Sequence, residues 1–196
     1  MINGVTPQDT KAKKVIAETG QKAVGTKRSN SRENGTVVAT INAAGVAMPP
    51  TIIFKGKRVQ AAWLNENGVL DATRAATESS LMQGQVFVNY RKEFKHNIVD
   101  SRLDDEKPQI LVLDGHASHA NVEVIQLSMS LNIDLFQIPA HSSHMTQSLD
   151  VTAFGTFKKA DTTVLTKFGR QNGGRKLVKA DMIDVIGQAW AGSFTT

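Results

Sequence analysis

Two kinds of hydrophobic pattern alternate along this chain and predict where its strands and helices lie. Short apolar and β-branched runs, bounded by glycine or polar residues, predict strands over residues 36–41, 50–54, 110–113 and 133–138. Apolar residues at helical spacing predict helices over residues 83–99, about 121–131, about 149–168 and 181–190. Polar stretches predict a loop over residues 1–20 and mostly loop, with partial helix, over residues 61–80.

The order of these elements predicts the fold class. The first two strands are joined by a short connection that contains Gly45, which is typical of an antiparallel hairpin. Residues 110–138 follow as strand, helix and strand, the pattern of a parallel β-α-β unit. An antiparallel group followed by such a unit predicts an α/β fold, with a mixed sheet and helices on its faces.

The same patterns predict which side chains are buried. Trp63 and Trp190 are interpreted as core residues, and Met82, Met129 and Met182 as core filler. Asp181 is predicted as the N-cap of the last helix. Apolar residues at helical spacing are expected to face the core, namely Val86, Phe87, Tyr90, Phe94, Ile98, Val151, Phe154, Phe157 and Leu165.

Two carboxylates mark the predicted strand–helix–strand unit. The wholly apolar run from Ile110 to Leu113 ends at Asp114, and α/β folds place their chemistry at the C-terminal ends of such strands. Asp150 comes 36 positions later, at the start of the predicted long helix. Two acids at the ends of neighbouring elements can hold Mg²⁺, which favours a few carboxylates together with water and substrate phosphate. Taken separately, each acid could also be structural, Asp114 capping a turn and Asp150 capping the helix.

Four histidines accompany these acids as two H-x-x-H pairs, His116 with His119 and His141 with His144. Four imidazoles could bind Zn²⁺ tetrahedrally, which keeps a zinc-dependent hydrolase open as an alternative. The other interpretation is that they orient the acids, contact phosphate or cap the following helices. His116 and His144 are nearest to the carboxylates in sequence and are the stronger candidates for orienting them.

Composition and charge narrow the class of protein. The chain has 196 residues, 40% hydrophobic and 21% charged, which is typical of a globular domain. It has no cysteine, so disulfides and thiolate metal sites are excluded, and its longest apolar runs of about five residues are far short of a membrane span. The net charge of +5 is concentrated in residues 11–32 and 158–179. Basic clusters on both sides of an acidic centre suit a nuclease, although solvated surfaces would give the same composition.

Three segments resemble the DDE superfamily endonuclease domain of pogo, Tigger and jerky-type transposases, whose relatives include centromere protein B. The segments around the two acids read LVLDGHASH and IPAHSSHMTQSLDVTAFGTFKK, and they are similar to the second and third acidic motifs of that family. The hairpin segment reads TVVATINAAGVAMPPTIIFKGK and resembles the hairpin that follows the family's first acid. The resemblance covers residues 4–190 and implies an RNase H-like fold with Mg²⁺- or Mn²⁺-dependent cleavage and transfer of DNA strands.

The resemblance makes Asp114 and Asp150 the second and third catalytic and metal-binding acids, with His116, His119 and His144 beside them. In the family, the first acid belongs to an Asp-Glu pair that precedes a glycine like Gly4, and Met1 and Ile2 stand at those positions here. We therefore expect one core domain over residues 1–196 that lacks its first strand, is cut short at both ends and is inactive as written.

The resemblance also implies DNA as the partner and the nucleus as the location, with no membrane contact and with homo-oligomerisation left open. We expect DNA to be contacted by Lys27, Arg28, Lys55, Lys57, Arg58, Lys158 and Lys159. Three functions stay open on the sequence: a transposase-type endonuclease, a domesticated or decayed core that binds DNA without cutting it, and the zinc hydrolase. Mg²⁺ against Zn²⁺ dependence separates the first from the third, and salt-sensitive binding without cleavage identifies the second.

Overall fold

The fold was analysed in a computed structural model, which describes residues 2–5, 19–20, 34–64, 67–100, 107–113, 122–138, 149 and 153–194. Two hydrogen-bonded sheets are present among these residues. The four-stranded sheet has the order β1-β2-β3-β4, formed by Ile2–Val5, Gly35–Ile41, Ala47–Lys55 and Thr73–Thr77. The two-stranded sheet is formed by β5, Gln109–Leu113, and β6, Ile133–Gln137. The helices are α1 (Gly84–Asp100), α2 (Val122–Ser130), α4 (Phe154–Gln171) and α5 (Lys179–Ala191), with a 3-10 turn, η1, at Ala61–Trp63.

The central hairpin has the predicted antiparallel pairing, with Val38 of β2 opposite Thr51 of β3. Its turn is held by Asn42, whose side-chain oxygen accepts the backbone N–H groups of Ala44 and Val46 at 3.0 and 2.9 Å. Gly45 has a φ of +86°, a conformation that a residue with a Cβ rarely adopts. The predicted parallel pairing of the β5–α2–β6 unit is also confirmed. The sheet is therefore mixed and flanked by helices, as the order of elements predicted.

Two short strands were not predicted. Ile2–Val5 pairs antiparallel with β2, although residues 1–20 were expected to be a loop. This strand pairs with the first residues of β2, although the chain was expected to lack its first strand. Thr73–Thr77 pairs parallel with β3, in a region expected to be loop and partial helix. Both strands are short and lack strong apolar alternation, so it is pairing with a distant strand that makes them extended.

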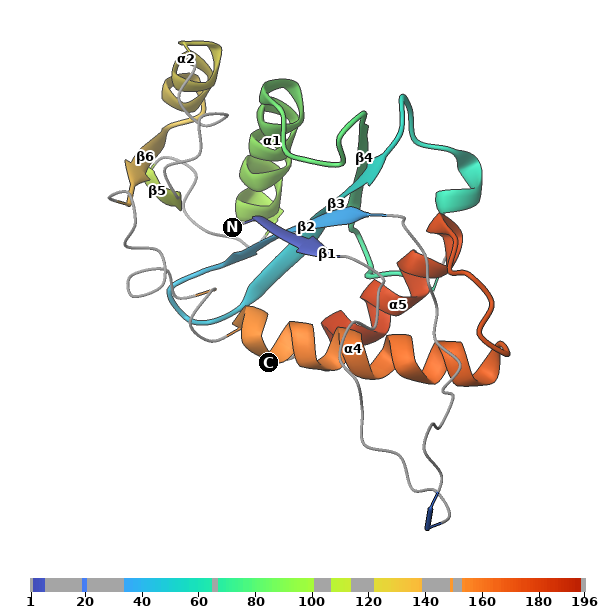
Figure 1. Cartoon of the computed structure of the whole chain (residues 1–196). Helices are drawn as coiled ribbons and strands as arrows, with labels where there is room; N and C mark the ends of the chain where they lie inside the picture. The colour runs from blue at the N-terminus through green and yellow to red at the C-terminus, as the bar shows by residue number, and fades with distance from the viewer. Residues whose placement is uncertain are drawn as a thin grey trace.

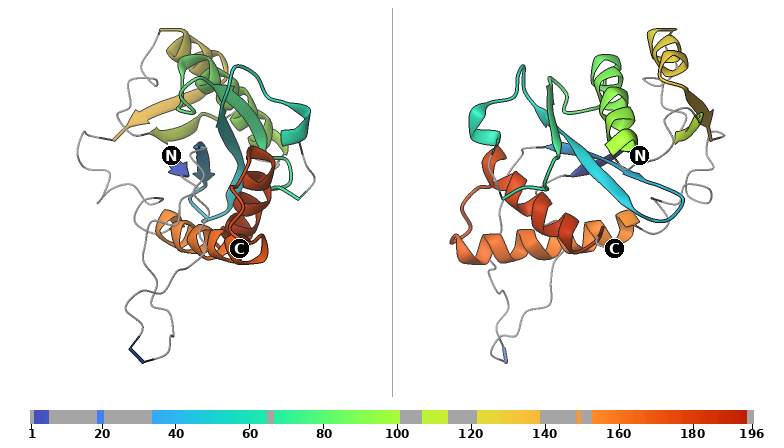
Figure 2. Two further views of the ribbon diagram at one scale, coloured as in Figure 1. Left: turned by 45° about the vertical axis from the view of Figure 1, so that its right-hand side comes forward. Right: turned by 180° about the vertical axis from the view of Figure 1, so that it is seen from behind.

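The four-stranded sheet is buried on both faces because β2 and β3 carry apolar residues at consecutive positions. Val37 and Ile52 point to one face, where they pack with α4 and α5, while Val38 and Ile53 point to the other and pack with α1, α2, β5 and β6. Figure 1 shows α4 and α5 on one side of the sheet and α1 on the other, and the rear view in Figure 2 agrees. The hairpin thus forms the centre of the protein between two cores.

The predicted inward-facing residues are buried wherever the structure describes their side chains, apart from Val86, which is half-buried. Trp63 and Trp190 belong to the core on the α4–α5 side, and Met82 and Met182 are also buried. Met129 is 75% exposed, so its prediction as core filler is wrong. The long helix α4 spans Phe154–Gln171, and Leu149 and Ala153 before it have π-helical conformation, so the predicted start near residue 149 is not contradicted. Residues 150–152 lie outside the described residues, as does the side chain of Ile98.

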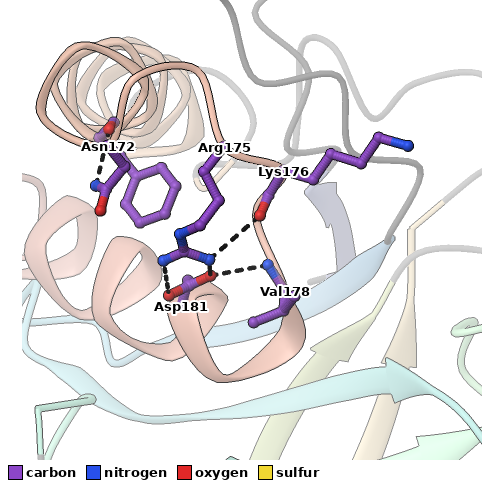
Figure 3. A network of polar contacts seen from close by, with 6 residues as sticks. Asn172, Arg175, Lys176, Val178 and Asp181 are labelled. Atoms are coloured by element: carbon purple, nitrogen blue, oxygen red, sulfur yellow. Dashed lines mark hydrogen bonds and ion pairs between the residues drawn. The ribbon is translucent and has the colours of Figure 1, made fainter.

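A polar clasp fixes the turn between α4 and α5 (Figure 3). Arg175 donates two hydrogen bonds to the Asp181 carboxylate, at 2.7 and 2.8 Å, and its guanidinium lies 4.9 Å from the ring centre of Phe168 on α4. Asp181 also accepts the backbone N–H of Val178 at 2.9 Å. Val178 is the N-cap of α5 and Asp181 is its third residue, so the prediction of Asp181 as the N-cap is wrong. The carboxylate acts from inside the first turn, where it satisfies a free N–H group.

Replacing Asp181 by Ala is expected to lower the melting temperature by about 2–4 °C, because α5 loses a capping interaction worth about 1 kcal/mol. The pKa of Asp181 is lowered, first by the hydrogen bonds from Arg175. The difference between the parent and the variant should therefore shrink as acidification protonates the carboxylate. Thermal unfolding followed by circular dichroism at pH 7 and pH 3 measures both effects. Arg175→Lys keeps the charge but loses the planar pair of hydrogen bonds to the carboxylate. Its melting temperature should therefore lie between those of the parent and of Asp181→Ala.

Candidate catalytic edge and nucleic-acid interface

The β5–β6 pair forms the frame of the predicted catalytic edge. The two strands run parallel from Gln109 opposite Ile133 to Leu113 opposite Gln137, so their C-terminal ends lie at the same edge. The ladder extends to the last residue of β5, because the Leu113 carbonyl accepts the N–H of Ile138 at 2.8 Å. Leu113 and Ile138 are both buried. The residue that directly precedes Asp114 in the sequence is therefore held by main-chain bonding and by packing.

The second part of this frame is the start of α4. Leu149, which directly precedes Asp150 in the sequence, is buried in the core that α4 and α5 share with the sheet. Phe154, the first residue of α4, belongs to the same core. Ile41 and Ala47, at the turn end of the hairpin, pack against this core, and Figures 1 and 2 show that turn beside the start of α4.

The predicted catalytic residues themselves lie outside the described residues. This holds for Asp114, Asp150, His116, His119, His141 and His144, and also for the predicted DNA contacts Lys27 and Arg28. Within the described part of the chain, no three His, Asp or Glu side chains are grouped so that they could hold a metal ion. The structure thus defines the strand that precedes Asp114 and the helix that follows Asp150, and the acid site itself stays a prediction.

Cations line the outer face of α4. Lys167 and Arg170 are exposed three positions apart, and the exposed Lys159 lies on the same side of the helix about two turns earlier. Lys158, next to Lys159 in the sequence, is also exposed. The acid of this helix, Asp161, is buried on the opposite face, so the outer face carries positive charge alone. The hydroxyls of Thr162, Thr163 and Thr166 donate to backbone carbonyls four residues earlier, at 2.7–2.9 Å. We call this exposed face, with Lys159, Lys167 and Arg170 separated by threonines, the α4 stripe.

The second described basic group, Lys55, Lys57 and Arg58, is exposed at the end of β3. Trp63 links this group to the α4–α5 turn. A Cβ on Gly56 would come within 3.1 Å of the Trp63 ring, and the Lys179 ammonium lies 5.0 Å from the centre of that ring. The Trp63 ring therefore lies beside both Gly56, which stands between Lys55 and Lys57 in the sequence, and Lys179, about 120 positions later. Periodicity could not have predicted this proximity.

The structure also buries two charged side chains that the sequence reasoning did not single out. Asp161 on α4 is 8% exposed, and its Oδ1 has no hydrogen-bond partner within the described part of the chain. Burial raises the pKa of this carboxyl to about 7. Arg91 on α1 is fully buried. Helical spacing holds a signal for Asp161, because it falls between Phe157 and Leu165 on the apolar stripe of α4.

Comparison with solved structures identifies the fold as RNase H-like. The chain is similar to the Mos1 transposase in its paired-end complex with the left transposon end, with a TM-score of 0.58 over 96% of this chain and 49% of the transposase chain. The two sequences are 12% identical, so this similarity concerns the fold.

The sequence gives the family. The DDE superfamily endonuclease model matches residues 32–195, and the chain belongs to this family. A curated protein named MFS-type transporter clz9, from Cochliobolus lunatus, is 30% identical over 148 residues, which are 74% of this chain and 16% of that protein. The chain therefore spans about a sixth of this relative. Among the helices that the structure describes, none is long and apolar enough to cross a membrane.

Proposed function

We propose that this chain is a transposase-derived DDE endonuclease core that acts on DNA, and that Asp114 and Asp150 are its second and third catalytic acids. The observation that carries this proposal is the family match over residues 32–195, combined with the frame around the two acids. Asp114 follows directly after a parallel strand whose last residue, Leu113, is buried, and Asp150 stands in the sequence between the buried Leu149 and the first turn of α4. The quoted motifs further support membership of the pogo, Tigger and jerky branch.

The proposed site suits a hard divalent cation. The side chains available are carboxylates and imidazoles, since the chain has no cysteine, and carboxylate oxygens are the ligands that Mg²⁺ and Mn²⁺ prefer. Asp114 and Asp150 would hold the metal, with His116, His119 and His144 orienting them or contacting phosphate. When bound, the metal would supply charge stabilisation and an activated oxygen for phosphodiester hydrolysis and strand transfer.

The residues at the position of the family's first acid limit the activity that we propose for this sequence. Met1 and Ile2 stand where the family has its Asp-Glu pair, and neither side chain binds Mg²⁺. Two carboxylates leave a two-metal site short of a bridging ligand, so we propose that this sequence cleaves DNA very weakly or not at all. The alternative function is a domesticated or decayed module that binds DNA without cutting it. The α4 stripe favours this alternative, since binding needs only the fold and its cations.

DNA binding gives the direct test of both functions. The chain is expected to bind a DNA duplex with an affinity that falls steeply with salt, because each contacted phosphate releases counterions. Replacing Lys159 and Lys167 together by Ala should make the negative slope of log K, where K is the DNA association constant, against log salt less steep by about 2. Fluorescence anisotropy between 50 and 200 mM salt measures the slope, and a nicking assay with Mg²⁺ in the same samples reports cleavage.

Lys92→Ala is the matched control, because Lys92 is an exposed lysine on α1, across the sheet from α4 (Figure 1). It should leave the slope almost unchanged. If Lys92→Ala reduced the steepness of the slope as much as the double variant does, the α4 stripe would be ruled out as the DNA surface. Absence of salt-dependent binding in the parent chain would contradict both proposed functions. Location in the nucleus and assembly with a second copy are further proposals, supported by the kind of substrate and by the family.

A further inference from the structure

Several buried polar atoms meet between α1 and α2 without hydrogen-bond partners in the described part of the chain. Arg91 on α1 is 0% exposed, and neither its Nε nor its Nη1 has an acceptor there. Ser128 on α2 is 2% exposed, and its Oγ also lacks a partner. Buried polar groups are nearly always hydrogen-bonded in folded proteins, so three such atoms at one interface need an explanation.

The helix geometry places these atoms around one point. The Nη2 of Arg91 donates a hydrogen bond to the carbonyl oxygen of Val124 on α2. In an α-helix, a carbonyl points toward the residue four positions later, which for Val124 is Ser128. The guanidinium therefore lies beside the turn of α2 that carries the Ser128 hydroxyl. The two unpartnered nitrogens, Nε and Nη1, and this hydroxyl all come from one small region of the interface.

The charge of Arg91 has no counter-charge within the part of the chain that the structure describes. Among the described residues, no carboxylate forms an ion pair with Arg91, and burial lowers its pKa. A guanidinium nevertheless keeps its proton in a protein, so the positive charge stays in the core. The ring of Phe87, centred 5.3 Å from the guanidinium carbon, offsets only part of the lost hydration. An unpaired buried charge is strongly destabilising, and a bound counter-charge would relieve that cost.

We propose that Arg91 and Ser128 form a binding site for a small inorganic anion of about the size of chloride. The ligand would accept hydrogen bonds from Nε–H and Nη1–H of Arg91 and from the Ser128 hydroxyl. The site is fully buried, which favours a small monovalent anion over a bulky one. It joins α1 to α2 on the side of the sheet away from the α4 stripe, and it does not depend on the proposed DNA function.

Chloride replaced stepwise by gluconate at constant ionic strength tests this site, because gluconate is too large to enter. The melting temperature of the full chain should rise by about 3–5 °C for each tenfold increase in chloride above saturation. Arg91→Met keeps the side-chain length but removes the charge, and its melting temperature should not respond to chloride. At the lowest chloride concentration this variant should be at least as stable as the parent, since it buries no unpaired charge. Ser128→Ala should respond less than the parent.

Lys92→Met is the matched control, because it removes a neighbouring but exposed charge and should keep the full chloride response. A parent protein whose melting temperature does not depend on chloride would overturn the proposal. An equal response in Arg91→Met would also overturn it, since the effect would then be general. Should Arg91→Met fail to fold, crystals grown in bromide decide the matter. An anomalous peak beside Arg91 supports the site, and no peak at that position contradicts it.

Discussion

Restoring two acids at the start of the chain is expected to produce Mg²⁺-dependent nicking of DNA, and replacing Asp114 by Asn in that version is expected to abolish it. The restored version carries a new initiator methionine followed by Met1→Asp and Ile2→Glu. It would complete the set of three carboxylates that a two-metal site needs. Asp114→Asn and Asp150→Asn each remove a charged ligand with almost no change in size, so the loss would reflect metal binding rather than packing.

The measurement is the conversion of supercoiled plasmid to the nicked form with Mg²⁺, Mn²⁺ or Zn²⁺. Mg²⁺ and Mn²⁺ should support nicking, whereas activity with zinc alone would favour the histidine site. Asp134→Asn is the control, because Asp134 is an exposed acid on β6 and its replacement should leave nicking intact. Nicking that persists in Asp114→Asn would rule out the assignment of the site. Circular dichroism must show that the new acids preserve the fold, since Ile2 of β1 pairs with Val38 of β2.

Replacing Asp161 by Asn is expected to stabilise the protein by about 2–4 kcal/mol at pH 8 and to have little effect near pH 4. The carboxyl lies on the buried stripe of α4, and its burial raises the pKa from 3.8 to about 7. Between these two values the folded protein binds a proton that the unfolded chain has released. The free energy of unfolding therefore falls as the pH rises from about 4 to 7, and the full cost is present above pH 7. Asn is neutral at every pH and escapes this cost, although its amide is also buried.

Urea unfolding at pH 5 and pH 8 tests this expectation, with fluorescence of Trp63 and Trp190 as the signal because both residues are buried in the core. The parent should be less stable at pH 8 than at pH 5, and Asp161→Asn should remove most of that difference. Asp134→Asn again serves as the control, since an exposed carboxyl contributes little. Equal stability of the parent at both pH values would show that the carboxyl is not buried in the charged form.

Much of the fold could be predicted because its signals are local. The hairpin, α1 and the β5–α2–β6 unit each carry a hydrophobic repeat within one segment, and a repeat of 2 or 3.6 residues selects a strand or a helix before any distant contact forms. The family motifs around Asp114 and Asp150 are equally local. Their residue types and spacing were sufficient to indicate a carboxylate site, although the positions of the side chains stay predictions.

The strands β1 and β4 show where local reasoning fails. Thr73–Thr77 reads T-R-A-A-T, which contains no large apolar residue, and it becomes a strand because β3 offers it an edge to pair with. Such pairing is decided by residues about twenty positions away, and a window along the sequence does not contain that information.

The sequence by itself determined the α/β class, the family and the pair of acids on which the proposed chemistry depends. Only the tertiary structure decided which charges are buried and which cations share a surface. Helical spacing places Asp161 on the apolar stripe of α4, but only packing shows that the charged groups of Asp161 and Arg91 are themselves removed from water. The Lys179 ammonium on α5 lies 5.0 Å from the ring centre of Trp63, and the same ring lies beside Gly56 just after β3. Hydrophobic periodicity is a property of neighbours along the chain, whereas burial and electrostatics depend on neighbours in space.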